Sequence, residues 1–205
     1  MLDYGCGVGA FLKVLSSNGF FPFGVEYGSD VAKHARDITA CEVMSVEKFL
    51  ALSPKPSFDV IYLGDVLEHL SNPIDSLNTI LPFLKTGGIL FVEGPLEDNP
   101  SLVYWASLVY GWLKYSLRSD LIMFHSPFHL FRTESKQQLA FFGRVSTSLE
   151  LKHMNIFETG FPYSHGGYIK RFIANISIIL SGKPFFGRTF GNRFQMIFTK
   201  NGDKI

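Results

Sequence analysis

The first eleven residues, MLDYGCGVGAF, constrain this chain more than any other stretch. An apolar pair leads into Asp3, glycine follows at positions 5, 7 and 9, and an apolar helical pattern comes next. This order predicts the end of a strand, a glycine turn and the start of a helix. Glycine lets the backbone approach a ligand without a Cβ atom in the way, and the helix N-terminus points at that ligand. We interpret the stretch as a cofactor site of the nucleotide type.

Strand and helix patterns alternate through residue 92. We expect strands at 1–4, 20–25, 41–45, 58–63 and 89–92, with helices at 11–18, 29–38 and 72–86. Near-continuous apolar strands that alternate with helices predict an α/β fold, a Rossmann-like doubly wound, mostly parallel sheet with helices on both faces. We expect Ser29 or Asp30 to cap the second helix, Asn72 and Pro73 to begin the third, Pro82 to kink it and Gly87-Gly88 to end it.

Polar residues stand where these strands end. They are Asp3, Glu26, Ser45, Asp65 and Glu93. Ligands of open parallel sheets bind beyond the carboxyl ends of the strands. The pattern therefore predicts one shared site at this edge.

The later part of the chain follows a different pattern. Residues 102–113 are mostly apolar with four aromatics, which predicts an aromatic helical insertion or lid after the fifth strand. They are too few for a bilayer span of about 20 residues, so a lid helix, a dimer surface and an interfacial membrane helix remain open. We expect a helix from Thr133 to Phe142 stopped by Gly143, and strands at 146–154 and 194–200. The apolar residues 173–180 are not placed.

Composition limits the class of protein. A chain of 205 residues with 46% hydrophobic residues predicts one globular domain with a small lid. Its two cysteines, Cys6 and Cys41, form no disulfide framework, so we expect the cytoplasm, and no signal peptide is recognised. Residues 1–100 hold 6 Lys and Arg against 13 Asp and Glu, whereas no acid lies between Thr159 and Gly202. This basic segment favours an anionic or carrier-linked acceptor or contact with a membrane surface, while nothing indicates nucleic acid or an oligomeric state.

Six motifs resemble the class I S-adenosylmethionine-dependent methyltransferases, within them the bacterial group of ubiquinone-type and sugar O-methyltransferases. The motifs are LDYGCGVG at 2–9, GVE at 24–26, FDVI at 58–61, DVLEHL at 65–70, LKTGGIL at 84–90 and HLFRT at 129–133. The resemblance implies an enzyme with S-adenosyl-L-methionine as its cofactor.

The resemblance also implies the cofactor contacts. Gly5, Gly7 and Gly9 would approach the methionine part, Asp3 its ammonium group, and Glu26 the ribose hydroxyls. The full expected set is Asp3, Gly5, Cys6, Gly7, Gly9, Glu26, Tyr27, Ser45, Val46, Gly64 and Asp65. Ser45 stands where the family often has an Asp that binds the adenine amine, so the backbone of Ser45 and Val46 would take that role.

The helices that precede this glycine turn in the family are absent from the sequence. We therefore expect an N-terminally shortened chain, in which residues 1–95 form the cofactor-binding core, 96–132 the acceptor lid, and 133–205 the helix and strands that complete the sheet.

Methyl transfer to an oxygen is helped by a general base, and histidine suits this role by its pKa. His69 directly follows the fourth strand and is the first candidate, with His125 and His129 second. Asp65, Glu68 and His69 raise the idea of a metal, but their spacing matches no common ligand signature, so we expect none.

Two other functions remain open. One is a non-catalytic, methyltransferase-like binding module. The other is an NAD-dependent oxidoreductase, because Gly5, Gly7 and Ala10 also satisfy the dinucleotide fingerprint and Glu26 would suit a ribose.

Overall fold

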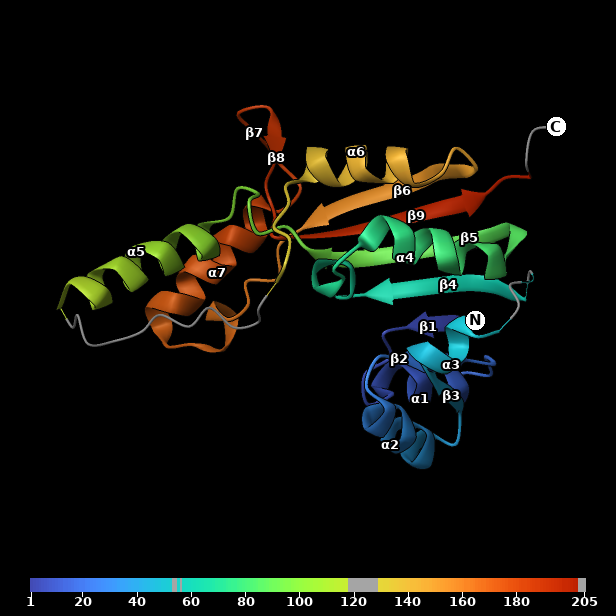
Figure 1. Ribbon diagram of the computed structural model, residues 1–205. Coiled ribbons are helices and arrows are strands. Elements are labelled where there is room, and N and C mark those ends of the chain that lie inside the picture. Colours follow the sequence, from blue (N-terminus) through green and yellow to red (C-terminus); the bar gives the residue numbers. More distant parts are fainter. Residues whose placement is uncertain (53–54, 56, 118–128, 203–205) are drawn as a thin grey trace. The chain divides into compact units, whose positions relative to one another are not determined.

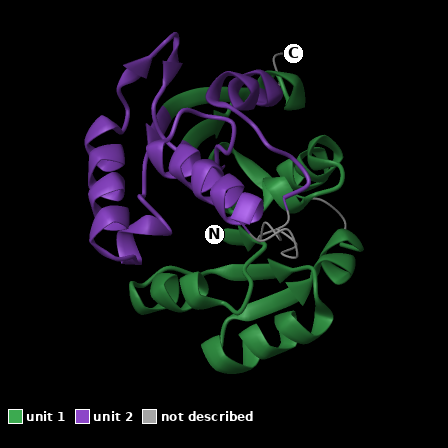
Figure 2. Cartoon of the chain, turned by 90° about the vertical axis from the view of Figure 1, so that its left-hand side faces the viewer, with its two compact units in different colours: residues 1–93, 143–153, 196–205 green, residues 94–142, 154–195 purple. Residues whose placement is uncertain are grey.

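The computed structural model describes residues 1–52, 55, 57–117 and 129–202. It divides into two compact units, shown in green and purple in Figure 2. Unit 1 comprises residues 1–93, 143–153 and 196–205, and unit 2 comprises residues 94–142 and 154–195.

The chain forms a seven-stranded sheet in the order β3-β2-β1-β4-β5-β9-β6 (Figure 1). Its strands are β1 (Leu2–Tyr4), β2 (Phe23–Glu26), β3 (Glu42–Ser45), β4 (Phe58–Gly64), β5 (Leu84–Pro95), β6 (Leu149–Phe157) and β9 (Arg193–Lys200). The five strands from β3 to β5 pair in parallel. The expected α/β fold with a mostly parallel sheet is confirmed.

The central strands β1, β2, β4 and β5 are rich in buried apolar residues, as is typical of parallel strands covered on both faces. Leu2, Val25, Ile61, Leu90 and Val92 are fully buried. A separate buried cluster joins Cys6 and Leu12 to the small residues Ala32 and Ala35 and to Val43. Small residues on the second helix let it pack closely against the first helix and the sheet.

Four α-helices connect these strands: α1 (Ala10–Ser17), α2 (Ser29–Thr39), α3 (Val46–Leu50) and α4 (Pro73–Ile80). The expected start of α4 is confirmed, since Asn72 is its N-cap and Pro73 its first residue. Pro82 lies in a 3₁₀ turn, η2 (Leu81–Phe83), directly after the helix, as its ring and missing N–H predict.

Some expected boundaries were wrong. The N-cap of α2 is Gly28 rather than Ser29 or Asp30, and no side chain caps this helix. Gly87 and Gly88 lie inside β5 instead of ending a helix, because the chain has already left the helix at Pro82. Gly87 has φ +77°. The register of β4 against β5 shifts at this point, because Phe58 pairs with Leu84 whereas Val60 pairs with Ile89. The two glycines therefore lie in an irregular part of β5.

Unit 2 is built on two helices, α5 (Leu102–Leu117) and α7 (Tyr168–Leu180), which lie side by side (Figure 1). Unit 2 also contains the 3₁₀ turn η3 (Tyr163–His165) and the short strands β7 (Pro184–Phe185) and β8 (Arg188–Thr189). A further 3₁₀ turn, η1 (Leu67–His69), belongs to unit 1. Val103, Tyr163 and Ala174 form the small core between the helices. Residues 173–180, which the sequence did not place, therefore form most of α7.

A buried carboxylate ties the two helices together. Glu158 is 5% exposed, and its Oε2 accepts hydrogen bonds from Ser101 Oγ at 2.6 Å and Ser177 Oγ at 3.1 Å. Its Oε1 accepts from the backbone N–H of Gly160 at 3.0 Å. Ser101 directly precedes α5 and Ser177 lies within α7, so one side chain fixes both helices.

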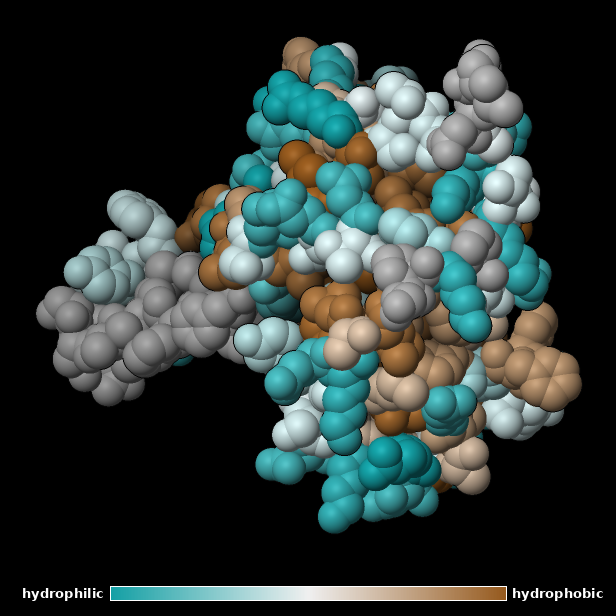
Figure 3. All heavy atoms as spheres, turned by 45° about the vertical axis from the view of Figure 1, so that its right-hand side comes forward, coloured by the Kyte–Doolittle hydropathy of each residue, from teal (hydrophilic) through white to brown (hydrophobic). Residues whose placement is uncertain are grey.

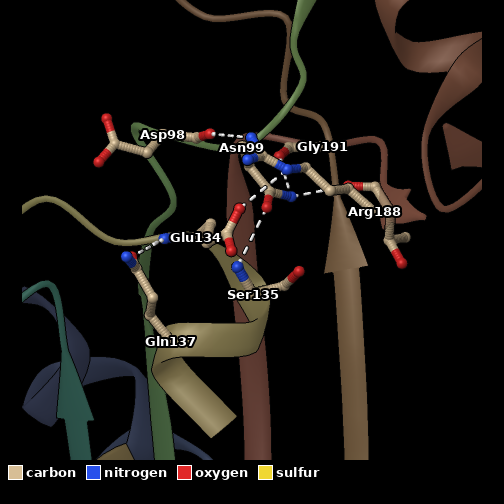
Figure 4. A network of polar contacts seen from close by, with 8 residues as sticks. Asp98, Asn99, Glu134, Ser135, Gln137, Arg188 and Gly191 are labelled. Atoms are coloured by element: carbon tan, nitrogen blue, oxygen red, sulfur yellow. Dashed lines mark hydrogen bonds and ion pairs between the residues drawn. The ribbon is translucent and has the colours of Figure 1, made fainter. Parts of the chain in front are cut away.

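A second polar network anchors the start of α6 (Ser135–Val145), as Figure 4 shows. Asn99 Nδ2 donates to the carbonyl oxygens of Thr189 at 2.7 Å and Gly191 at 2.9 Å, while its Oδ1 accepts from the N–H of Ser135 at 3.1 Å. Arg188 pairs with Glu134 at 3.0 Å. The helix passes through Gly143, so the expected stop at this residue was wrong.

No helix in the described part of the chain has the length and apolar character that crossing a membrane requires. On the face drawn in Figure 3, apolar side chains reach the surface among polar ones.

Candidate functional site

The glycine turn follows β1 and carries three positive φ angles: +88° at Gly5, +53° at Gly7 and +81° at Gly9. A Cβ atom on Gly5 would lie 2.4 Å from Val66 Cγ2, so packing excludes a larger residue there. A Cβ atom on Gly7 would meet nothing within 4 Å. Gly7 therefore leaves open space above the backbone of the turn.

Glu26, the last residue of β2, holds this turn. Its Oε2 accepts a hydrogen bond from the N–H of Gly7 at 2.8 Å, and its Oε1 accepts from the N–H of Tyr27 at 2.8 Å. The N–H groups of Gly5 and Cys6 both donate to the carbonyl oxygen of Val25, at 2.7 and 3.1 Å. These hydrogen bonds thus join the turn and the end of β2 around the Glu26 carboxylate.

Asp3 lies in β1, beside Gly24 of β2 and Tyr62 of β4. It is 3% exposed. Burial, together with the charge of Glu26, raises the pKa of Asp3 to about 7. A buried carboxyl group beside a second acid is stabilised in its ionised form by a cation.

The other cofactor residues expected in the first three strands have different settings. Ser45 is opposite Glu26 in the β2–β3 register, and its Oγ accepts from Lys48 N as the N-cap of α3, which begins at Val46. Tyr27 is 87% exposed. The Cys6 side chain belongs to the buried cluster under α1, and burial raises its pKa to about 12, so the thiol stays protonated and is no nucleophile.

Near the end of β4, Tyr62 is a residue that the sequence did not single out for the site. Tyr62 Oη donates to Glu93 Oε1 at 2.5 Å, and burial and this hydrogen bond raise the pKa of Tyr62 well above its usual range. The Tyr62 ring packs on Phe11 with centroids 4.8 Å apart. A Cβ on Gly64 would lie 2.2 Å from Tyr62 Oη. Asp65 has φ +54°, and its N–H donates to the carbonyl oxygen of Glu93 at 3.0 Å.

The sequence did not identify Tyr62 as a site residue because it lies in an apolar strand and matches no motif. Only the parallel register, which places it beside Asp3, reveals its place in the site. Glu93 was identified only as a polar residue at a strand end.

Unit 1 therefore brings the strand-end residues together at one edge of the sheet. Charges on Glu93, Asp3 and Asp65 all contribute to the raised pKa of Tyr62, and the charge of Glu26 contributes to that of Asp3. Four carboxyl groups with an open glycine turn suit a ligand that carries positive charge and a pair of hydroxyl groups. S-adenosylmethionine has both, so the residues present fit this cofactor.

The candidate general bases are not all in unit 1. His69 is exposed at the end of η1 in unit 1. His129 is in unit 2, where its Nδ1 contacts Glu97 Oε1 at 2.9 Å, while Glu97 Oε2 pairs with Arg132 Nε at 3.0 Å. His125 lies outside the described residues. His69 therefore belongs to unit 1 and His129 to unit 2.

Solved structures share the fold of this chain. A "SAM dependent methyltransferase from Archaeoglobus fulgidus" superposes with a TM-score of 0.60 over 97% of this chain and 85% of that chain, at 17% sequence identity. At this identity the likeness shows the fold, which is that of the Rossmann-like methyltransferases.

The sequence of residues 1–133 matches the family described as "Methyltransferase domain", and the chain belongs to this family. The resemblance to class I S-adenosylmethionine-dependent methyltransferases is thereby confirmed, and with it S-adenosylmethionine as the cofactor of the family.

Among the curated relatives, two match a little under half of the chain. The chain is 29% identical over 103 residues to "Ubiquinone biosynthesis O-methyltransferase" of Glaesserella parasuis, covering 45% of this chain and 44% of the relative. It is 32% identical over 97 residues to "2-methyl-6-phytyl-1,4-hydroquinone methyltransferase" of Synechocystis, covering 45% of this chain and 30% of the relative. The chain thus spans less than half the length of either relative.

Proposed function

We propose that this chain binds S-adenosylmethionine in unit 1 and transfers its methyl group to an oxygen atom of a small or glycan-like acceptor. The observation that carries the proposal is the open glycine turn held by Glu26 beside the buried Asp3. Family membership supports the cofactor, and the O-methyltransferase named among the relatives supports the oxygen acceptor.

The bound cofactor supplies an activated methyl sulfonium, so the protein has mainly to bind, orient and exclude water. Glu26 uses each carboxylate oxygen on a backbone N–H and has lone pairs left for the ribose hydroxyls. Asp3 gains a partner in the ammonium group of the cofactor. Tyr62 and Glu93 limit the space at the end of β4. Ser45 and Val46 offer backbone groups to the adenine.

We propose His129 as the general base for the acceptor hydroxyl. Its Nδ1 hydrogen-bonds with Glu97 Oε1 at 2.9 Å, which orients the imidazole ring. Arg132 orients the other oxygen of Glu97. His69 and His125 are the alternative bases, and the role of residues 96–132 in holding the acceptor belongs to the same proposal.

Calorimetric titration with S-adenosylmethionine tests the core of the proposal. We expect binding to wild-type protein and a loss of affinity of about tenfold or more in Glu26→Gln, which keeps the size of the side chain but removes its charge. Glu42→Gln, which changes an exposed acid at the start of β3, is the matched control. Absence of heat with the cofactor, together with binding of NADH, would overturn the proposal in favour of an oxidoreductase.

Methyl transfer to a panel of phenols, catechols and sugar hydroxyls tests the catalytic part. We expect His129→Gln to lower kcat by about a hundredfold at unchanged cofactor affinity, and Glu97→Gln to have a smaller effect. His153→Gln changes an exposed histidine of β6 and serves as the control. Full turnover in His129→Gln with loss in His69→Gln would refute the assignment, and cofactor binding without turnover on any acceptor would indicate a binding module.

A further inference from the structure

Unit 2 presents an unusually apolar surface on its two long helices. From Leu108 to Leu117, α5 contains only Gly111, Lys114 and Ser116 besides apolar and aromatic residues. All seven of these apolar and aromatic side chains are exposed, Trp112 to 66% and Leu117 to 83%. A helix that faces water on one side is normally polar on that side. This one is apolar around most of its circumference.

The neighbouring helix α7 has the same character. Ile169 is 78% exposed, and Phe172 and Ile179 are each 66% exposed. Only Ala174 and Ser177 of this helix are buried. We call the exposed side chains of α5 from Leu108 onward, together with those of α7, the α5–α7 surface.

A groove of about 660 Å³ lies between the two helices. Aliphatic and aromatic side chains of both helices and of Tyr163 line it, and among the described residues Lys170 is the one charged residue in its lining. Lys170 Nζ lies 5.5 Å from the ring centroids of both Tyr110 and Tyr163. The positive charge is thus held beside the apolar groove.

The charges of the α5–α7 surface have one sign. Neither helix contains an acidic residue, while Lys114, Lys170 and Arg171 provide positive charge. The Arg171 guanidinium lies over the exposed ring of Tyr168, with Cζ 5.1 Å from the ring centroid. Exposed Trp and Tyr rings next to Lys and Arg are the composition that favours the boundary between lipid headgroups and acyl chains.

We propose that the α5–α7 surface docks on an anionic lipid bilayer, with its apolar side chains in the headgroup–acyl boundary and its basic residues on the lipid phosphates. With 16 residues, α5 is about 24 Å long. A helix needs about 20 residues to span a bilayer, so in this proposal α5 lies along the interface. A second copy of the chain fits this surface less well than a bilayer does. A two-fold symmetric contact would bring the same basic residues of the two copies together, and their charges would repel.

The tryptophans make this surface directly observable. The chain has two, Trp105 and Trp112, and both are in α5. With vesicles of phosphatidylcholine and phosphatidylglycerol (3:1) we expect the full chain to co-sediment, its tryptophan emission to shift to the blue, and brominated lipid to quench it. With vesicles of phosphatidylcholine alone, or at high salt, we expect binding to fall at least tenfold.

Matched variants locate the contact. Ile169→Ser with Phe172→Ser should abolish vesicle binding, and Lys114→Gln with Arg171→Gln should weaken it about tenfold. Phe21→Ser, which changes a 91% exposed residue of unit 1, should leave it unchanged. Far-UV circular dichroism and urea unfolding followed by tryptophan fluorescence, both without vesicles, check that each variant remains folded in unit 2.

Three results would overturn the proposal. They are equal binding to neutral and anionic vesicles, co-sedimentation without a change in tryptophan emission, and absence of vesicle binding in a chain that sediments as a dimer. The proposal does not depend on methyl transfer, so a failed activity assay leaves its test intact.

Discussion

The carboxyl group of Asp3 links the stability of unit 1 to pH. Its ordinary pKa is 3.8, and burial next to Glu26 raises it to about 7 in the folded chain. Between pH 4 and 7 the unfolded chain has lost this proton while the folded chain still holds it. The free energy of unfolding contributed by this group therefore falls as pH rises through this window and levels off above it.

We predict that Asp3→Asn is more stable than wild type at pH 8, by about 2 kcal/mol, and gains little at pH 4. The asparagine amide is neutral at every pH, so the pH-dependent loss disappears. Urea unfolding at pH 4, 6 and 8 measures this difference. Asp37→Asn, which changes an exposed acid of α2, should follow the wild-type profile. Parallel profiles for Asp3→Asn and wild type would contradict the raised pKa.

The glycine turn gives a second prediction on single residues. Gly7 and Gly19 both have positive φ, +53° and +81°, and a Cβ atom on either would meet nothing within 4 Å. Replacing either by alanine should cost about 1 kcal/mol of unfolding free energy because of backbone strain alone. Only Gly7→Ala places a methyl group above the cofactor turn.

We therefore predict that Gly7→Ala weakens S-adenosylmethionine binding at least tenfold, measured by calorimetry, while Gly19→Ala binds as wild type does. Equal affinity in the two variants would show that the cofactor does not approach this turn.

At the scale of single elements, α4 shows how local chemistry sets a helix boundary. Asn72 Oδ1 accepts from the N–H of Asp75 at 3.4 Å, and Pro73 follows in a position where its missing N–H costs nothing. Both features are readable in the sequence, and they are confirmed. The end of the helix is equally local, because Pro82 cannot continue it.

We predict that Asn72→Ala lowers the unfolding free energy by about 1 kcal/mol, since the first turn of α4 loses its cap. Asn78→Ala changes an exposed residue in the same helix and should be neutral or slightly stabilising, because alanine has the higher helix propensity. Urea denaturation compares the two, and equal effects would argue against the cap.

Other elements depend on distant parts of the chain. Gly87-Gly88 looks like a helix stop, yet its role is set by pairing with β4. Gly143 looks like another stop, yet α6 continues through it to Val145. At Gly87-Gly88, strand pairing overrides a local signal of about 1 kcal/mol.

At the scale of the whole molecule, the two compact units hold different chemistry. The expected cofactor residues are all in unit 1, whereas both tryptophans are in unit 2. Glu158 fixes the helices of unit 2 through two serine hydroxyl groups. Its loss leaves those buried hydroxyl groups without their acceptor.

We predict that Glu158→Ala destabilises unit 2 by about 3 kcal/mol, seen as an earlier transition in tryptophan fluorescence, while affinity for S-adenosylmethionine changes less than about twofold. Glu150→Ala, which removes an exposed acid of β6, should shift neither property. A parallel loss of cofactor affinity in Glu158→Ala would show that unit 1 depends on this network.

The sequence alone determined the sheet, the family and most of the residues proposed to bind the cofactor. The alternation of strands and helices and the strand-end acids are local patterns, and parallel strands bring their carboxyl ends together whatever the details of packing. Asp3, the glycine turn and Glu26 could be named for this reason.

Only the tertiary structure decided which groups stand beside them. Tyr62 joined the candidate site through its register with Asp3, and His129 gained a hydrogen-bond partner in the distant Glu97. The apolar residues of α5 and α7 were readable as a pattern, but their exposure was not. Register, burial and protonation arise from contacts between residues far apart in the chain, which no local pattern encodes.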